Sequence, residues 1–388
     1  MVLKDILINI RDFIIFLIDG VFKVFIRQKN DYYDKRILLI RTDAIGDFVL
    51  WLDVAKTIRE YYKEYQITLI CNELVADLAN NIPYFDNIIS IKPLIFHKNL
   101  IYRYKILKSI SVFSYEKAIH FPYTRHQYFL NGETIIRIVR AKEKIGSVGE
   151  KVRDWRYKLG NRFYTKLIDA TNDNIMEIER NAEFLKGLGF INYQAKVYKF
   201  PEVIFSNVKY EYDYIIFPGA GSIKRRWPVK NFVEIAKFLF QENGWKGLIC
   251  GGPGEEHLGN EIIKITTIPL TNIIGKTSLT ELISLIANAK LIISNETSAI
   301  HIAAAVNTAS ICLLGGGHYK RFVPYPASLN DLFLPEVVSY KMKCFNCNWN
   351  CVYDLKQNEP YPCIQKIQTD KVINVIKNIN RKIINKYL

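Results

Sequence analysis

The sequence lacks the features that mark secreted, nucleic-acid-binding and dinucleotide-binding proteins. Acidic residues appear early and no small-residue cleavage site follows the first apolar stretch, so we expect no secretory signal. No zinc-finger or RRM pattern is present, and neither a Walker loop nor GxGxxG occurs. Seven cysteines at uneven spacings in 388 residues are not typical of a disulfide scaffold. These absences favour a cytoplasmic protein.

Acidic residues are also outnumbered. The chain has 53 Lys and Arg against 38 Asp and Glu, a net charge of +15. Such an imbalance indicates an anionic partner, which is nucleic acid, phospholipid or a phosphorylated substrate. Because no nucleic-acid motif accompanies the charge, we expect no nucleic-acid partner. Hydrophobic residues make up 49% of the chain, a globular composition long enough for two domains.

Residues 1–34 form a separate N-terminal segment. Helical spacing places its charges near one face: Asp5, Asp12, Asp19, Lys23 and Arg27. Each charge costs ~2.5–3.5 kcal/mol at a bilayer centre, which disfavours a membrane-spanning helix. A broad apolar face with a narrow charged stripe is typical of a helix that lies on a membrane surface or packs on a partner. A helix docked on the protein's own core is the alternative.

Beyond residue 35, short apolar runs alternate with amphipathic helical spacing in two parts of the chain. The first part, 35–190, contains RILLI, ITLIC, NIISI and KAIHF, and a long polar and helical stretch from about 150 ends it. The second, 191–367, contains YIIF, GLIC, NIIG, LIISN and ASICLL. This alternation predicts two α/β domains with parallel sheets and a cleft between them. Residues 368–388 read as a basic closing helix, with membrane contact as the second interpretation.

Four junctions between a strand-like run and a helix carry polar side chains. In the first, RTDAIGDFVL, Asp47 stands at the start of a helix. Its carboxylate either caps the helix or acts as a general base at the mouth of the cleft.

The second junction, FPGAGSIKRRWP, follows the apolar run YIIF. Its candidate ligand-binding residues are Gly219, Gly221, Ser222, Lys224, Arg225 and Arg226. Glycines allow close approach of the backbone to a ligand, and amides, cations and a helix N-terminus together make a pyrophosphate site. A solvated loop is the alternative.

The third and fourth junctions present carboxylates. In ICGGPGEEHL, Glu255 is either a partner of the helix dipole or an acceptor for ribose hydroxyls. In SNETSAIHIAAA, Glu296, Thr297 and Ser298 offer a carboxylate and two hydroxyls at a helix N-terminus, where capping is the alternative. His301 belongs either to this site or to the core.

Together these segments resemble glycosyltransferase family 9, the heptosyltransferases and their relatives. RILLIRTDAIGDFVLWLDVAKTIREYY is similar to the family's opening segment with its Ile-Gly-Asp, and FPGAGSIKRRWPVKNFVEIAKFL is similar to its NPGA…KRWP segment. LTELISLIANAKLIISNETSAIHIAAAVNTASICLLGG is similar to the segment that contains Asp-Ser/Thr-Gly. The resemblance covers about residues 36–318. It implies a GT-B fold, in which two Rossmann-like α/β/α domains face a central cleft.

The resemblance also implies a reaction. The family transfers a sugar with inversion and without a metal, by default heptose from ADP-heptose, to a hydroxyl of a bacterial surface glycan such as lipopolysaccharide core. Domain 35–190 would bind this acceptor, lipid-linked or phosphorylated, and domain 191–367 the nucleotide sugar. Such a protein would work peripherally at the inner face of the cytoplasmic membrane. No cofactor is implied for the transfer.

Roles for individual residues follow from the same resemblance. Asp47 would deprotonate the acceptor hydroxyl, Arg225 with its neighbours would bind the donor phosphates, and Glu255 would lie near the ribose. Glu296, Thr297 and Ser298 would line the donor pocket. Glu296 replaces the family's usual Asp, which leaves the donor sugar open. A non-catalytic glycan- or membrane-binding protein and a sugar-nucleotide epimerase are the alternatives.

Four cysteines gather in CFNCNWNCVYDLKQNEPYPC: Cys344, Cys347, Cys351 and Cys363. The CxxC pair is half of a tetrathiolate site, for which Zn²⁺ is the commonest metal. Such a site would be structural, pinning a loop of the C-terminal domain. Free or transiently oxidised thiols are the alternative.

Overall fold

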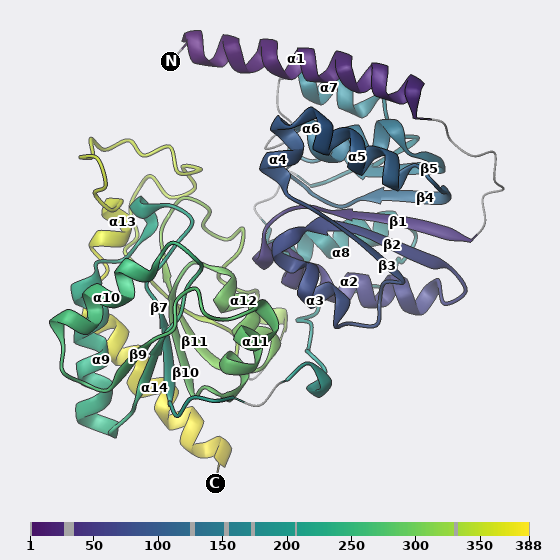
Figure 1. Cartoon of the computed structure of the whole chain (residues 1–388). Helices are drawn as coiled ribbons and strands as arrows, with labels where there is room; N and C mark the ends of the chain where they lie inside the picture. The colour runs from purple at the N-terminus through teal and green to yellow at the C-terminus, as the bar shows by residue number, and fades with distance from the viewer. Residues whose placement is uncertain are drawn as a thin grey trace. The chain divides into compact units, whose positions relative to one another are not determined.

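The computed structural model describes residues 2–26, 35–124, 129–150, 155–171, 175–205, 208–329 and 333–387. The chain folds into two compact units (Figure 1). The first comprises Met1–Phe48, Val54–Asp173 and Arg180–Gln194. The second comprises Val49–Asp53, Asn174–Glu179 and Ala195–Leu388.

In the described part of the first unit, six parallel strands form one sheet in the order β3-β2-β1-β4-β5-β6. They are β1 (Arg36–Arg41), β2 (Gln66–Asn72), β3 (Asn87–Ile91), β4 (Ser114–His120), β5 (Arg140–Ser147) and β6 (Lys166–Ile168). The central strand β1 is a continuous apolar run because both of its faces are covered; Ile37 to Ile40 are fully buried.

The helices described in this unit pack beside the sheet. They are α1 (Val2–Phe25), α2 (Ile45–Tyr61), α3 (Ala76–Asn80), α4 (Pro93–Lys98), α5 (Leu100–Ile110), α6 (Phe129–Ile138), α7 (Trp155–Asn161) and α8 (Glu177–Gly187). Helix α1 contacts other helices, α5, α6 and α7. Leu38 and Ile40 of β1 share one apolar cluster with Phe96 of α4, Leu107 of α5 and Ile135 of α6. That cluster places α4, α5 and α6 on the same face of the sheet.

The second unit repeats this plan. Over its described residues, six parallel strands take the order β12-β11-β10-β7-β8-β9. They are β7 (Tyr214–Phe217), β8 (Gly247–Ile249), β9 (Leu270–Asn272), β10 (Leu291–Asn295), β11 (Ala309–Leu314) and β12 (Glu336–Ser339). The helices are α9 (Val229–Asn243), α10 (Glu256–Ile265), α11 (Leu279–Asn288), α12 (Ser298–Ala305), α13 (Pro362–Gln365) and α14 (Thr369–Tyr387).

The last helix closes the second unit, as the amphipathic spacing of residues 368–388 predicted. Val372, Ile376 and Ile379 of α14 are buried in the main apolar cluster of this unit, together with Phe232 and Leu239 of α9. The prediction of two α/β domains with parallel sheets is confirmed.

One sequence expectation was wrong in the first unit. The stretch from about residue 150 is not only helical, because β6 lies within it and adds a strand to the sheet. A second strand, β5, lies before this stretch and was not predicted. The run RAKEKIGS of β5 reads as polar, and its first five residues are indeed only partly buried or exposed. Its pairing with β4 makes it a strand all the same.

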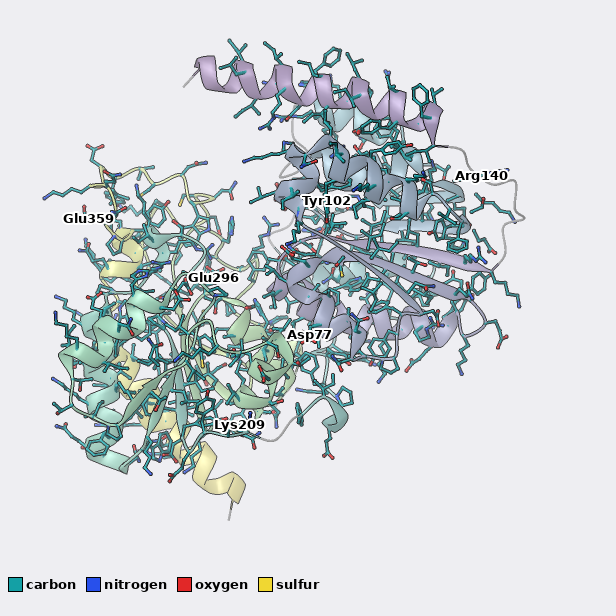
Figure 2. The ribbon with its side chains drawn as sticks, in the orientation of Figure 1. Asp77, Tyr102, Arg140, Lys209, Glu296 and Glu359 are labelled. Carbon is teal, nitrogen blue, oxygen red and sulfur yellow. The ribbon has the colours of Figure 1, made fainter. Side chains whose placement is uncertain are left out.

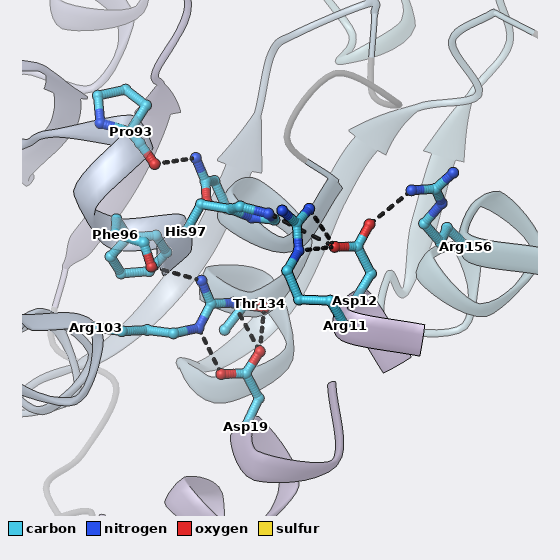
Figure 3. Close-up of polar contacts among 10 residues, drawn as sticks. Arg11, Asp12, Asp19, Pro93, Phe96, His97, Arg103, Thr134 and Arg156 are labelled. Carbon is cyan, nitrogen blue, oxygen red and sulfur yellow. Dashed lines mark hydrogen bonds and ion pairs between the residues drawn. The ribbon is translucent and has the colours of Figure 1, made fainter. Parts of the chain in front are cut away.

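Helix α1 docks on the first unit by its charged stripe (Figure 3). The carboxylate of Asp19, fully buried, accepts two hydrogen bonds of 2.7 Å from the guanidinium of Arg103 and one of 2.7 Å from Thr134 Oγ1. The carboxylate of Asp12 accepts from Arg156 Nη1 at 2.7 Å. The side chain of Lys23 is exposed. Arg27 and the side chain of Asp5, also placed on the stripe, lie outside the described residues.

The opposite face of α1 is apolar and exposed. Its exposed large side chains are Ile6, Leu7, Ile10, Phe13, Ile14, Leu17, Val21, Val24 and Phe25. Within the described residues, no helix is both long and apolar enough to cross a membrane. The helix is therefore docked on its own unit through its charged stripe. A helix that packs on a protein core normally turns its apolar side inward instead.

Candidate functional site

The predicted donor-binding residues follow three neighbouring strands of the second sheet. Parallel β10, β7 and β8 lie side by side, so their carboxyl ends meet at one edge. The loops after these strands carry Gly219 to Arg226, Gly251 to Glu255, and Glu296 to Ser298. The carboxyl edge of a parallel sheet is the usual ligand-binding edge of such folds.

Glu255 ties the loops after β7 and β8 together. Its Oε1 accepts hydrogen bonds from Ala220 N and Arg226 Nη2, both at 3.1 Å, and its Oε2 accepts from Gly252 N at 3.2 Å. It stands at the N-cap position of α10, yet its side chain makes no capping hydrogen bond. A side chain at Gly219 would collide with this carboxylate, because a Cβ there would lie 2.0 Å from Glu255 Oε2.

Arg225 and Glu296 connect the loops after β7 and β10. Arg225 Nη2 lies 3.1 Å from Glu296 Oε2, and the Glu296 side chain is only 7% exposed. Its Oε1 is buried and has no hydrogen-bond partner among the described residues. Burial raises the pKa of Glu296 to about 7, and the nearby Arg225 opposes that rise. The site thus holds a buried carboxyl group with one acceptor unused.

Asn295 is a part of this arrangement that the sequence did not single out. It is fully buried, and its Nδ2 donates to the carbonyl oxygens of Pro218 and Gly219 at 2.9 and 3.1 Å. Its Oδ1 accepts from Trp227 N at 3.0 Å. Its place directly before Glu296 was the only available signal. Asn295 fixes the cationic loop to the end of β10.

The hydroxyl residues at α12 behave differently from the carboxylates. Thr297 is the N-cap of α12, and its Oγ1 accepts from Ala299 N at 3.3 Å. Capping, the alternative interpretation, is therefore observed for Thr297, while Ser298 begins the helix. His301 is buried and its Nδ1 lies 2.9 Å from the hydroxyl of Tyr325. Burial lowers its pKa to about 4, so it belongs to the core.

The remaining loop residues are more accessible. Gly221 is exposed, and a Cβ there would have no neighbour within 4 Å. Ser222 precedes a short 3-10 turn (Ile223–Arg225) without capping it. Lys224 is half-buried and makes no ion pair with any described residue. Its carbonyl oxygen accepts from Tyr361 N at 2.8 Å, and its ammonium group remains available to an anion.

Asp47 lies in the first unit, in the first turn of α2. The N-cap of this helix is Ala44, which makes no side-chain capping bond. The backbone carbonyl of Asp47 accepts from Arg41 Nη2 at 3.1 Å, and Arg41, fully buried, also contacts Asp43. Asp47 is therefore an acid of the first helical turn, not the N-cap residue.

The cysteine cluster does not support the expected zinc site. Its four thiols line one small pocket with Trp349 and Tyr361. Among the described residues, which include all four, no group of three or more His, Cys, Asp or Glu is placed to hold a metal ion. All seven cysteines are free, and burial raises the pKa of both Cys347 and Cys363. Free thiols, the alternative, agree with this arrangement.

Comparison with known proteins identifies the family. Residues 139–350 match the model of glycosyltransferase family 9 (heptosyltransferase), which covers more than half of the chain. The chain belongs to glycosyltransferase family 9. It is accordingly a glycosyltransferase, which disfavours both the epimerase and the non-catalytic alternatives.

Individual relatives agree with this family. The chain is 25% identical over 311 residues to the lipopolysaccharide core heptosyltransferase OpsX of Haemophilus influenzae, covering 75% of this chain and 82% of that protein. The family 9 glycosyltransferase of Veillonella parvula is similar in structure with a TM-score of 0.69 at 17% identity, covering 91% of this chain and 99% of that one. The Escherichia coli heptosyltransferase WaaC, solved with ADP-2-deoxy-2-fluoro heptose, gives 0.65 at 17%, with coverage of 88% and 99%. The predicted GT-B fold is confirmed.

Proposed function

We propose that this protein transfers heptose from ADP-heptose to a hydroxyl of lipopolysaccharide core, with inversion and without a metal ion. The relatives support this choice of substrates, since one is named for lipopolysaccharide core and another was solved with an ADP-heptose analogue. The observation that carries the proposal is an arrangement of cations and carboxylates at the carboxyl edge of β10, β7 and β8. The cations are Lys224, Arg225 and Arg226, and the carboxylates are those of Glu255 and Glu296.

The cations suit a leaving diphosphate. Arg225 and Lys224 lie in the loop that follows β7, and Gly221 leaves the backbone open beside them. Negative charge develops on the diphosphate as its bond to the sugar breaks, and positioned cations and amides stabilise that charge more than the ground state. No metal ion is needed for this role.

The carboxylates suit hydroxyl groups of the donor. The unused Oε1 of Glu296 is a hydrogen-bond acceptor for a sugar hydroxyl, since a buried acceptor without a partner is costly. Glu255 already accepts from three protein donors, and its two oxygens retain capacity for a ribose hydroxyl. The residues that we propose to bind the donor are Gly219, Gly221, Ser222, Lys224, Arg225, Glu255, Glu296, Thr297 and Ser298.

Asp47 is the proposed general base. In one step, the acceptor oxygen attacks the anomeric carbon while the bond from that carbon to the diphosphate breaks. The proton of the acceptor hydroxyl passes to the Asp47 carboxylate, and ADP leaves with the bonding electron pair. Attack from the side opposite to the leaving group inverts the anomeric centre. Base catalysis of this kind contributes typically 10²–10⁴-fold.

The test compares Asp47→Asn with Asp77→Asn. Asp77, labelled in Figure 2, occupies the first turn of α3 in the same unit and is exposed, so it is a matched control. We expect Asp47→Asn to lower heptose transfer by about 10²-fold or more while ADP-heptose binding is retained, and Asp77→Asn to transfer normally. Near-normal turnover of Asp47→Asn would show that this carboxylate is only a helix-dipole partner.

We further propose that the exposed apolar face of α1 lies on the inner face of the cytoplasmic membrane, where a lipid-linked acceptor is found. Burying one Leu, Ile or Phe side chain is worth about 1.5–3 kcal/mol, and α1 presents nine large apolar side chains. The charge of the chain supports an anionic surface as partner. Residues 92–166 carry 17 Lys and Arg against 5 Asp and Glu, which is +12 of the total +15. The elements that hold α1, from α4 to α7, belong to this range.

Vesicle binding tests the membrane proposal. We expect the full-length protein to sediment with vesicles that contain phosphatidylglycerol and much less with phosphatidylcholine alone. Leu17→Glu should reduce this binding about tenfold or more, since it removes one buried apolar side chain and adds an anion. Ile191→Glu, at a site 75% exposed in the same unit but outside α1, is the control. A dimer that Leu17→Glu dissociates, without vesicle binding, would assign this face to a second copy of the chain.

A further inference from the structure

The cysteine-rich segment Met342–Cys363 contacts the cationic loop of the donor site. Tyr361 N donates to the carbonyl oxygen of Lys224 at 2.8 Å. The guanidinium carbon of Arg225 lies 4.3 Å from the ring centroid of Trp349. Arg225 is therefore contacted from two sides, by the carboxylate of Glu296 and by the face of an indole ring.

Trp349 is itself held by several contacts. Its ring stacks on Tyr361 with 5.4 Å between centroids. Its Nε1 donates to His318 Nδ1 at 3.2 Å, and its carbonyl oxygen accepts from the Tyr361 hydroxyl at 3.2 Å. His318 Nε2 in turn lies 2.7 Å from Asn348 Oδ1. The orientation of the indole ring is thus determined from its edge, its face and its backbone.

Two glycines after β11, Gly315 and Gly317, make room for this ring. A Cβ at Gly317 would lie 2.2 Å from the indole of Trp349, and one at Gly315 would lie 2.8 Å from it. The backbone of the segment follows the same glycines, because Asn348 N donates to the carbonyl oxygen of Gly317 at 3.0 Å. Side chains at these positions would displace the indole ring from Arg225.

The backbone of Trp349 is left-handed, with a φ of 59°. A bulky residue in this conformation is strained and persists only where its surroundings enforce it. Such strain gathers at functional sites. The contacts of Trp349 therefore maintain an unfavourable backbone that places the ring against Arg225.

We propose that Trp349 is a positioning residue of the donor site, and that its ring face holds the Arg225 guanidinium in place for a nucleoside diphosphate. A second carboxylate in its place would hold the arginine equally well but would cancel its charge. The electron-rich face of an indole orients a cation and leaves its positive charge for the phosphates. This inference rests on the proposed function, and it gives the cysteine segment a role in donor binding beyond the structural one.

Calorimetric titration with ADP tests this proposal on the full-length protein. We expect Trp349→Leu to weaken ADP binding by about 3- to 30-fold, the range of a partly desolvated cation–π contact, while Trp349→Phe retains most of the affinity. Leu and Phe both fill apolar volume, but only Phe presents a ring face. Trp245→Leu is the control, since that ring contacts Lys290 in the same unit.

A double-mutant cycle separates positioning from general structure. If Trp349 acts through Arg225, Trp349→Leu should have no further effect on ADP binding in an Arg225→Ala background. Equal losses in both backgrounds, or equal effects of Leu and Phe, would overturn the proposal while the donor site stands. Absence of ADP binding by the unmodified protein would instead overturn the donor-site assignment, and this proposal with it.

Discussion

Replacing Glu296 by Gln should change how the stability of the protein depends on pH. The carboxyl group is buried beside Arg225, and its pKa is raised to about 7 from an ordinary 4.5. That difference corresponds to about 3 kcal/mol, at 1.36 kcal/mol for each pKa unit. Gln has nearly the same shape and carries no charge at any pH.

Proton linkage gives the direction in which the free energy of unfolding changes with pH. The folded protein holds the Glu296 proton more tightly than the unfolded chain, so this group lowers the free energy of unfolding as the pH rises from about 4.5 to about 7. Below pH 4.5 this penalty to the free energy of unfolding is absent, and above pH 7 it has reached its full value. The Gln variant lacks the penalty. Its stability relative to the unmodified protein should therefore rise by about 2–3 kcal/mol between pH 5 and pH 8.

The assay is guanidinium unfolding of both proteins at pH 5 and pH 8, followed by tryptophan fluorescence. The difference between the two proteins at each pH cancels every other titrating group. Glu234→Gln, at an exposed position on α9, reports the general effect of removing a glutamate from this unit. A difference between Glu296→Gln and the unmodified protein that is the same at both pH values would refute the burial argument.

Two further predictions concern stability at named contacts. Asp19→Ala leaves Arg103 buried without its charge partner. It should lower the free energy of unfolding of the first unit by about 3–5 kcal/mol. A loss below about 1 kcal/mol in denaturant titration would mean that α1 does not dock through this pair. Gly219→Ala should push the Glu255 carboxylate aside, cost about 1–3 kcal/mol and weaken ADP binding, whereas Gly221→Ala, with open space around its Cβ, should leave the stability unchanged. Equal effects of the two glycine substitutions on melting temperature would contradict the packing of Glu255.

Most strands of both sheets could be predicted because buried parallel strands are apolar on both faces. YIIF and LIISN coincide with β7 and β10. β5 was missed because its first five residues are partly exposed and mostly polar. Its position in the sheet depends on pairing with β4 and β6, which no local pattern reports.

Candidate site residues could be named from the sequence where their immediate neighbours along the chain explain their presence. Glycines and cations after a buried strand indicated an anion site that includes Arg225. Glu255 came from a different junction, where an acid opens the helix after an apolar run. Trp349 could not be predicted, because its contact with Arg225 joins residues 124 positions apart. The orientation of α1 also escaped prediction, since the partners of Asp12 and Asp19 outside α1 lie 84 to 144 residues further along the chain. A helical spacing reveals two faces but not which one is buried.

A metal-independent diphosphate site can be tested by calorimetric titration of the full-length protein with ADP, UDP, GDP and CDP in the presence of EDTA. We expect ADP to bind without metal and more tightly than the others. Arg225→Ala should weaken this binding, whereas Lys290→Ala, which removes an ion pair with Asp213, should not. Binding of none of these nucleotides, or binding that requires a divalent metal ion, would contradict a metal-independent diphosphate site at the end of β7.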